Sequence, residues 1–271
     1  MYIYSHLHLP MEHPSTLRQL SEASLGNIRL VATDMDGTLT INNKFSATLL
    51  QALEDLATAG IKVLIITGRS AGWVSALSHL MPVVGAIAEN GGLFYPSGDD
   101  QPIILTPIPD LADHRHSLGM VFEELKSKFP CIQESADNGF RVTDWTFRVA
   151  GLSLDELEVL SNLCEEMGWG FTYSNVQCHI QPLGQNKAVG LLQVLKKHLP
   201  EFSLEEVLTV GDSPNDESLF DQGRFPVSVG VANVIKYANQ LQYLPSYLTT
   251  AAEGEGFCEL CSYILQNGFL R

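Results

Sequence analysis

The sequence predicts an α/β fold in which a doubly wound parallel sheet is built from both ends of the chain and is interrupted by a smaller α+β domain. Apolar strand-like runs alternate with amphipathic helical segments in residues 28–95, and the alternation returns in residues 185–271. This pattern is typical of a parallel sheet covered by helices on both faces. Between these two parts, strand-like segments follow one another closely, which favours antiparallel pairing in a separate sheet.

The first half of the predicted core begins with an apolar run that is typical of a buried strand. The helix that follows it has its leucines on one face, and Gly60 marks its end. In order, we expect a strand at 28–32, a helix at 45–59, a strand at 62–66, a helix at 71–80 and a strand at 83–88.

We place the inserted α+β domain at residues 96–184. A hairpin around residues 96–102 leads into it. Two rounds of helix, strand and strand then suggest an internal repeat with a largely antiparallel sheet. The expected elements are helices at 111–129 and 154–167, and strands at 131–135, 139–149, 170–173 and 177–181.

The second half of the core resumes the parallel pattern. It is expected to hold strands at 207–210 and 227–229, and helices at 186–199, 217–222, 235–240 and 256–266.

Residues 1–27 precede the core as a polar N-terminal extension, which we expect to be mobile or loosely docked, with a short helix within residues 15–24. His6 and His8 have a spacing that suits a metal ion, but we favour the interpretation of a simple extension over a metal site.

Composition limits the classes of function. The 271 residues suffice for a large core with a second domain, and 45% hydrophobic with 17% charged residues is an ordinary globular balance. A formal net charge of -15 argues against nucleic acid and anionic lipid as partners. We expect a monomer or a small homo-oligomer.

The cysteines and the hydropathy point to a cytoplasmic protein. The five cysteines are odd in number and scattered, so they suggest no disulfide framework. Cys258 and Cys261 have a redox or zinc spacing without a partner pair, and we interpret them as core residues. No apolar run approaches the ~20 residues of a membrane span, and the N-terminus lacks a signal-peptide pattern.

Two carboxylates, Asp34 and Asp36, follow the first predicted strand and precede Gly37 and Thr38. Residues two apart in an extended chain point the same way, so both carboxylates are expected to face one spot. Like charges so close need a bound cation or a shared proton. Taken alone, the motif is equally compatible with an ordinary Asp-Gly turn.

Three further polar stretches fall at strand ends or at a helix start. They are Thr67-Gly68-Arg69, Lys187, and Gly211-Asp212-Ser213-Pro214-Asn215-Asp216. Each has an ordinary interpretation by itself, as an N-cap, a solvated lysine or an Asx turn. Because ligands of parallel sheets bind at the carboxyl ends of strands, their joint occurrence favours one site.

These four stretches, in this order, resemble the haloacid dehalogenase superfamily of phosphotransferases, from residue 28 to the C-terminus. The resemblance implies a Rossmann-like core. The inserted domain resembles the type II cap of subtype B, which is similar to that of Cof-type and sucrose-phosphatase-like phosphatases and, more distantly, of eukaryotic phosphomannomutase. Asp36 fits phosphatases and phosphomutases of this superfamily, so we do not expect dehalogenation.

The resemblance implies catalytic roles that the chemistry of the residues supports. Asp34 is expected to attack phosphorus and form an aspartyl-phosphate. Asp36 is expected to protonate the leaving alcohol and then to activate water. Thr67 and Lys187 are expected to bind the oxygens of the transferring phosphoryl group.

The resemblance also implies a magnesium ion, which suits an oxygen-only ligand set. The expected ligands are the Asp34 carboxylate, the Asp36 backbone carbonyl and Asp212, with Asp216 completing the acidic cluster.

Thr38, Gly68, Arg69, Asn90 and Asn215 are expected to bind substrate. For Arg69 a salt bridge to the acidic site is an open alternative. Asn90 is as compatible with a glycine turn, and Asn215 with a bond to a metal-bound water or to Lys187.

The cap side chains are harder to place. Arg141, His179 and Gln181 lie on predicted cap strands, where facing the cleft and facing solvent are equally compatible with the sequence. Trp145 and Trp169 are large enough to stack on a sugar ring, but we favour packing inside the cap.

The sequence therefore predicts a magnesium-dependent phosphomonoester hydrolase acting on a small phosphorylated metabolite, with a sugar phosphate as the expected substrate. A phosphomutase of the phosphomannomutase type is the main alternative. A metabolite-binding protein without turnover ranks below both, because no catalytic residue of the motif set is missing.

Overall fold

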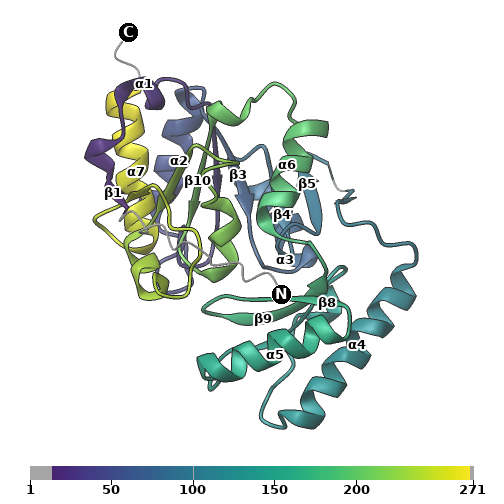
Figure 1. Cartoon of the computed structure of the whole chain (residues 1–271). Coiled ribbons are helices and arrows are strands. Elements are labelled where there is room, and N and C mark those ends of the chain that lie inside the picture. Colours follow the sequence, from purple (N-terminus) through teal and green to yellow (C-terminus); the bar gives the residue numbers. More distant parts are fainter. Residues whose placement is uncertain (1–13, 100, 269–271) are drawn as a thin grey trace, which may run out of the picture.

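The computed structural model describes residues 14–99 and 101–268 (Figure 1). Its largest element is a nine-stranded sheet that is parallel except at one edge. The strands, in their order across the sheet, are β1 (Ser15–Thr16), β12 (Tyr247–Leu248), β11 (Val227–Gly230), β10 (Val207–Gly211), β2 (Leu30–Thr33), β3 (Lys62–Ile66), β4 (Gly85–Ala88), β5 (Leu93–Pro96) and β6 (Ile103–Ile104). The predicted α/β class is confirmed.

Helices cover both faces of this sheet, because its inner strands are apolar on both sides. The helices α2 (Ala47–Thr58), α3 (Ala71–Leu80) and α7 (Glu253–Asn267) share a hydrophobic core with one face. Helix α6 (Lys187–Lys197) packs on the other face. The core also holds the short segments α1 (Glu22–Leu25), η1 (Leu17–Gln19), η3 (Leu204–Glu206), η4 (Pro214–Leu219) and η5 (Ala232–Tyr237).

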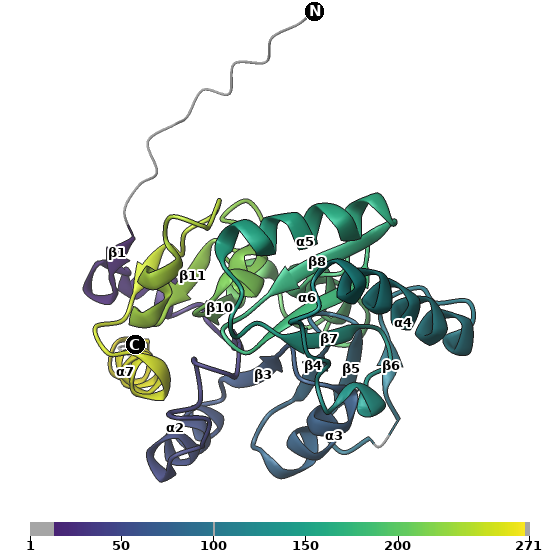
Figure 2. The same cartoon turned by 90° about the horizontal axis from the view of Figure 1, so that it is seen from below.

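A second, three-stranded antiparallel sheet forms the cap, in the order β7 (Trp145–Arg148), β9 (Gln177–Pro182), β8 (Trp169–Tyr173). The helices α4 (Leu111–Lys128) and α5 (Leu154–Glu166) close a separate hydrophobic core with these strands. Figure 2 shows the cap elements together, while α2 and α7 lie side by side at the other end of the molecule.

The cap differs from the sequence prediction at its start and in its first strands. β6 belongs to the large sheet, so the boundary at residue 96 is too early. The strand expected at 131–135 is reduced to a single bridge between Glu134 and Phe147. The strand expected at 139–149 begins only at Trp145, after the 3-10 segment η2 (Asn138–Phe140).

A side chain explains the shortened pairing. The Asn138 amide donates to the Thr146 carbonyl at 2.8 Å, and Asn138 Oδ1 accepts from the Thr146 N–H at 2.8 Å. Asn138 therefore satisfies the Thr146 N–H, which a longer neighbouring strand would otherwise pair, while the Thr146 carbonyl also accepts the Ser135 N–H at 3.0 Å.

The expectation of a loosely docked extension is wrong for residues 15–25. β1 pairs in parallel with β12 at the edge of the large sheet. Leu17, Leu20 and Leu25 are each at most 4% exposed and belong to the main core. In place of the expected helix at 15–24, the chain forms a short strand, η1 and α1. His6 and His8 lie outside the described residues.

Cys261 is buried in α7, and Cys258 packs beside the same core, as the sequence interpretation held. Within residues 14–99 and 101–268, no helix has the length and apolar character that crossing a membrane requires.

Candidate active site

The predicted motifs meet at the carboxyl edge of the large sheet. Asp34 follows β2, Thr67 follows β3, Asn90 lies just beyond β4, and Asp212 follows β10. β2 and β10 are neighbours although they come from opposite ends of the chain, and the Asp34 N–H donates to the Val210 carbonyl at 2.9 Å. The site thus lies where the two halves of the fold meet, a favoured ligand position in open α/β sheets.

Lys187 joins two carboxylates of an acidic cluster. Its Nζ lies 2.5 Å from Asp34 Oδ1 and 2.6 Å from Asp216 Oδ1, and the lysine side chain has no exposed area. Ligand atoms of Asp34, Asp212 and Asp216 lie within 4.8 Å of one another. The other Asp216 oxygen accepts the backbone N–H groups of Asp212 and Ser213 at 2.9 and 3.1 Å. Asp216 is therefore placed to hold Lys187 and the loop after β10.

Burial dominates the electrostatics of this cluster. It raises the pKa of Asp34 to about 7, although Lys187 acts in the opposite direction. It also raises the pKa of Asp212 well above its ordinary value, with Asp34 and Asp216 adding to the effect. Burial alone would lower the pKa of Lys187, but Asp216 and Asp34 raise it above its ordinary value. One ammonium thus leaves the carboxylates short of positive charge.

The residues fit a divalent cation. Asp34 Oδ2 is buried and has no hydrogen-bond partner among the described residues, a costly state that a cation would relieve. Asp212 is held in place from two sides: Thr38 Oγ1 donates to Oδ1 at 3.1 Å, and Asn233 Nδ2 donates to Oδ2 at 2.8 Å. The candidate ligand atoms are carboxylate oxygens of Asp34, Asp212 and Asp216, and oxygen is the ligand atom that magnesium prefers.

Gly37 leaves the space that brings the first motif against Asp212. Its φ is +89°, and a Cβ at this position would lie 2.6 Å from Asp212 Oδ2. A glycine is therefore required both by the backbone conformation and by the close approach. Asn233 was not predicted; its position just after β11, at the same edge of the sheet, was the signal available in the sequence.

Asp36 is paired with Arg69 in this structure. Arg69 Nε and Nη2 donate to the two Asp36 oxygens at 2.9 and 2.6 Å. The hydrogen bond to Asp36 raises the pKa of Arg69. The guanidinium also lies 4.8 Å from the ring centre of Trp73, a half-exposed residue that was not predicted. Of the two roles open for Arg69, the geometry matches the salt bridge.

The remaining core residues form a connected group. Thr67 Oγ1 accepts the Arg69 N–H at 3.1 Å. Asn215 Nδ2 donates to Asn90 Oδ1 at 3.0 Å, which ties the loop after β4 to the loop after β10. The Gly68 carbonyl accepts Arg141 Nη1 at 3.0 Å and so joins the core to the cap.

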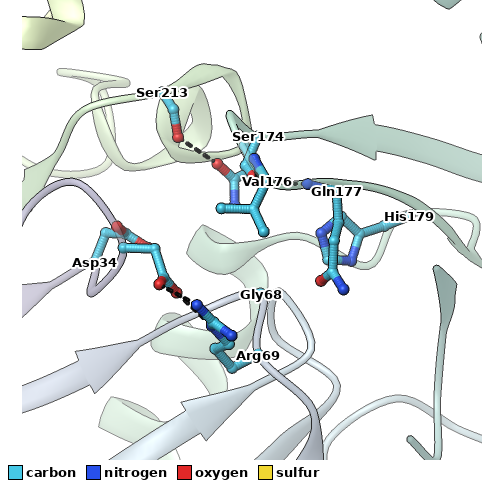
Figure 3. Close-up of a pocket in the computed structure, with 10 residues that line it drawn as sticks. Asp34, Gly68, Arg69, Ser174, Val176, Gln177, His179 and Ser213 are labelled. Carbon is cyan, nitrogen blue, oxygen red and sulfur yellow. Dashed lines mark hydrogen bonds and ion pairs between the residues drawn. The ribbon is translucent and has the colours of Figure 1, made fainter. Parts of the chain in front are cut away.

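A pocket opens between the core and the cap (Figure 3). Figure 3 shows Asp34 and Arg69 on one side of it and Gln177 and His179 on the other. The lining residues are Asp34, Asp36, Gly68, Arg69, Ser174, Val176, Gln177, His179, Ser213 and Asn215. A ligand in this pocket would lie between Asp34 of the acidic cluster and the β8–β9 hairpin of the cap.

The cap residues named from the sequence divide into two groups. His179 lines the pocket, whereas Arg141 and Gln181 are buried and absent from its lining. Arg141 has no exposed side-chain area and pairs with Asp144 and Asp137, both at 2.9 Å. The expectation that Arg141 and Gln181 face either the cleft or solvent is therefore wrong: both are buried, and Gln181 Nε2 donates to the Gln185 carbonyl at 2.6 Å.

The two cap tryptophans pack internally, as favoured. Trp145 lies 6.2 Å from the Phe122 ring and 4.5 Å from the Arg115 guanidinium. Trp169 lies 5.4 Å from the ring of His114.

Glu89 is a site residue whose role the sequence did not reveal. It is fully buried at a positive φ of 52°, and burial raises its pKa to about 7. Its carboxylate accepts the backbone N–H groups of Ala71, Val142 and Thr143 at 3.0, 3.1 and 2.6 Å. Glu89 therefore connects the start of α3 to the segment that enters the cap sheet.

Known proteins share this sequence pattern. The family model of haloacid dehalogenase-like hydrolases matches residues 31–137 and 154–240. A phosphoglycolate phosphatase of Methanothrix thermoacetophila is 27% identical over 252 residues, covering 90% of this chain and 100% of that protein. A phosphoglycolate phosphatase of Staphylothermus marinus is 26% identical, covering 88% of this chain and 98% of that protein.

Solved structures show the same fold. The sucrose-phosphatase of Synechocystis, solved with sucrose and phosphate, has a TM-score of 0.65 at 18% identity, covering 87% of this chain and 97% of that one. A Thermoplasma acidophilum protein has a TM-score of 0.71 at 20% identity, covering 88% of this chain and 98% of that one.

The chain belongs to the haloacid dehalogenase-like hydrolase family, because the family model covers well over half of it. Within that family, the prediction of a phosphatase is confirmed by the relatives that the chain matches along nearly its whole length.

Proposed function

We propose that this chain is a magnesium-dependent phosphomonoester hydrolase that acts on a small phosphorylated metabolite, most readily a sugar phosphate, through an aspartyl-phosphate. One observation carries the proposal: the buried Asp34 is held by Lys187 at 2.5 Å and keeps a second oxygen without a partner beside Asp212. A nucleophile and a cation site are thus combined in one place.

The cation would be held by the Asp34 carboxylate, the Asp36 backbone carbonyl and Asp212. When bound, it would neutralise negative charge on the phosphoryl oxygens and shield them from the carboxylate. Lys187 supplies a fixed positive charge beside Asp34, where the phosphoryl group would bind, and Asp216 holds the lysine extended toward Asp34. This charge is preorganised for the transition state of phosphoryl transfer.

In the proposed reaction an Asp34 oxygen forms a bond to phosphorus while the bond between phosphorus and the leaving oxygen breaks. Asp36 gives its proton to that oxygen and then takes a proton from the water that hydrolyses the aspartyl-phosphate. Both Asp36 oxygens accept from Arg69 in this structure, so its side chain must leave the ion pair to act as an acid. Thr67 and the amide groups near Gly68 and Thr38 would orient the phosphoryl group.

The test is phosphate release from a panel of sugar phosphates, phosphoglycolate, nucleotides and pyridoxal phosphate, each with magnesium and with chelator. We expect magnesium-dependent release that Asp34→Asn abolishes while the far-ultraviolet circular dichroism of the variant stays unchanged. Formation of an isomeric sugar phosphate, without stoichiometric phosphate release, would instead indicate a phosphomutase. A folded protein that releases phosphate from no ester would contradict the proposal.

A further inference from the structure

His179 is the one histidine of the described residues that lines the pocket facing Asp34. It lies on β9 of the cap, 1% exposed, and Figure 3 shows its ring across the pocket from Asp34. A Cβ added to Gly68 would lie 3.0 Å from its Cε1 and 3.2 Å from its Nε2. The Cε1–Nε2 edge of the ring therefore lies against the loop that follows β3.

The other ring nitrogen is fixed by a carboxylate. His179 Nδ1 lies 2.8 Å from Asp144 Oδ2, and the same carboxylate pairs with Arg141 at 2.9 Å. Burial opposes ionisation of Asp144, but Arg141 and His179 hold its pKa below the ordinary value. An ionised carboxylate only accepts hydrogen bonds, so Nδ1 must carry a proton.

The ring is consequently a neutral hydrogen-bond acceptor at Nε2. Burial lowers the pKa of His179, and the charges of Arg141 and Lys187 act in the same direction, against the pull of Asp144. With the Nδ1 proton directed to Asp144, Nε2 carries the lone pair. Among the described residues no donor pairs with Nε2, so its lone pair stays available to a ligand in the pocket that His179 lines.

The charges around the pocket disfavour a leaving group that carries a second negative charge. Among its described lining residues, Arg69 is the one permanent cation, and both Asp36 oxygens already occupy it. Arg141 is engaged by Asp137, Asp144 and Gln177 behind the pocket. A second anionic group on the substrate would meet the lone pair of His179, and it could pair with Arg69 only in competition with Asp36.

We propose that His179 is a specificity-determining residue whose Nε2 accepts a hydrogen bond from a hydroxyl of the substrate's leaving group, with Asp144 as the residue that positions the ring. This inference rests on the proposed phosphatase function and refines its substrate class. It favours phosphate esters of polyols and sugars over esters whose leaving group carries a carboxylate, such as phosphoglycolate.

The experiment compares three esters of similar size: glycerol 1-phosphate, propyl phosphate without hydroxyls, and phosphoglycolate with a carboxylate. The measured quantity is kcat/KM for phosphate release with magnesium. Because one neutral hydrogen bond is at stake, we expect glycerol 1-phosphate to exceed propyl phosphate by about 3- to 10-fold. We expect phosphoglycolate to rank below glycerol 1-phosphate.

Two variants separate the acceptor from the fold. His179→Asn can still donate from its amide to Asp144 but is too short to place an acceptor at the Nε2 position, so its ratio of glycerol 1-phosphate to propyl phosphate should fall to about one. His179→Gln reaches the Nε2 position and should retain part of the ratio. His116→Asn is the matched control, because His116 is an exposed histidine on α4 of the same cap. p-Nitrophenyl phosphate turnover reports that each variant is folded.

The outcomes are distinct. A wild-type protein that hydrolyses propyl phosphate as well as glycerol 1-phosphate, that prefers phosphoglycolate, or whose ratio survives His179→Asn overturns the inference and leaves the phosphatase function intact. A wild-type protein that releases phosphate from no ester, p-nitrophenyl phosphate included, overturns the proposed function and the inference with it.

Discussion

Replacing Lys187 by methionine tests the electrostatic design of the site. Methionine approximates the length and volume of the lysine stem, so packing around α6 is largely kept while the charge is lost. Lys187 is fully buried between Asp34 at 2.5 Å and Asp216 at 2.6 Å. Removing one partner of a buried ion pair leaves a buried charge uncompensated and costs about 3–5 kcal/mol. We therefore expect the free energy of unfolding at pH 8 to fall by this amount.

The assay is urea unfolding of wild type and Lys187→Met at pH 8 and pH 5.5, with and without magnesium. Burial already raises the pKa of Asp34 to about 7 in the presence of the lysine, so at pH 5.5 this carboxyl can be neutral and the loss should be smaller. Under the proposed function, magnesium would bind the folded state, so we expect it to restore part of the stability at pH 8. Lys196→Met, at an exposed position of the same helix, is the control and should change stability by under about 1 kcal/mol.

A loss at pH 8 no larger than that of Lys196→Met would refute the reasoning, since it would mean that the two carboxylates do not depend on Lys187 for their charge balance. A loss of equal size at both pH values would show that methionine disturbs packing rather than charge.

Two further predictions concern Glu89 and Gly37. Burial raises the pKa of Glu89 to about 7 from an ordinary 4.5, so protonation of this carboxyl favours the folded state. The resulting gain in the free energy of unfolding is complete below pH 4.5 and is lost as the pH rises through 7, by about 3 kcal/mol in total. The wild type should therefore lose about that much stability, relative to Glu89→Gln, between pH 4.5 and pH 8 in urea titrations, and parallel pH curves would contradict this. Gly37→Ala should weaken magnesium activation at least tenfold, a cost of about 1.4 kcal/mol, because its Cβ would meet Asp212 at 2.6 Å. Gly60→Ala, with a positive φ but nothing within 4 Å, should cost only about 1–2 kcal/mol of stability and leave the magnesium dependence of phosphate release unchanged.

The regular part of the fold follows from local patterns. The buried strand β3 and helix α3 coincide with the predicted ranges 62–66 and 71–80, because apolar runs and helical periodicity are properties of neighbouring residues. The motif residues of the core converge because parallel strands end at one edge of a sheet, so Asp34 and Asp212 are brought together by topology that the alternation already implies.

Features that depend on contacts between residues far apart in the chain could not be predicted from the sequence. β1 and β12 have two residues each and are strands only because they pair with each other and with β11. The contact of Asp144 with His179 joins residues 35 positions apart and depends on the register of the cap strands. The turn that shortens the first cap strands depends on the Asn138 side chain. In the sequence, nothing distinguishes this asparagine from any other polar loop residue.

The charges of the acidic cluster do not balance among the protein's own side chains. If ionised, Asp34, Asp212 and Asp216 bring three negative charges to a single ammonium, that of Lys187, and a phosphomonoester adds ≈ −1.5 to −2 more at pH 7. Asp36 also raises the pKa of Asp34, but its own charge is paired with that of Arg69. Under the proposed function, a divalent cation would offset the excess negative charge of the cluster and so reduce its repulsion of the substrate phosphate. The unpartnered oxygen of Asp34 is then a prepared ligand rather than a defect of packing, and the positive charge of Lys187 serves to hold that ligand ready.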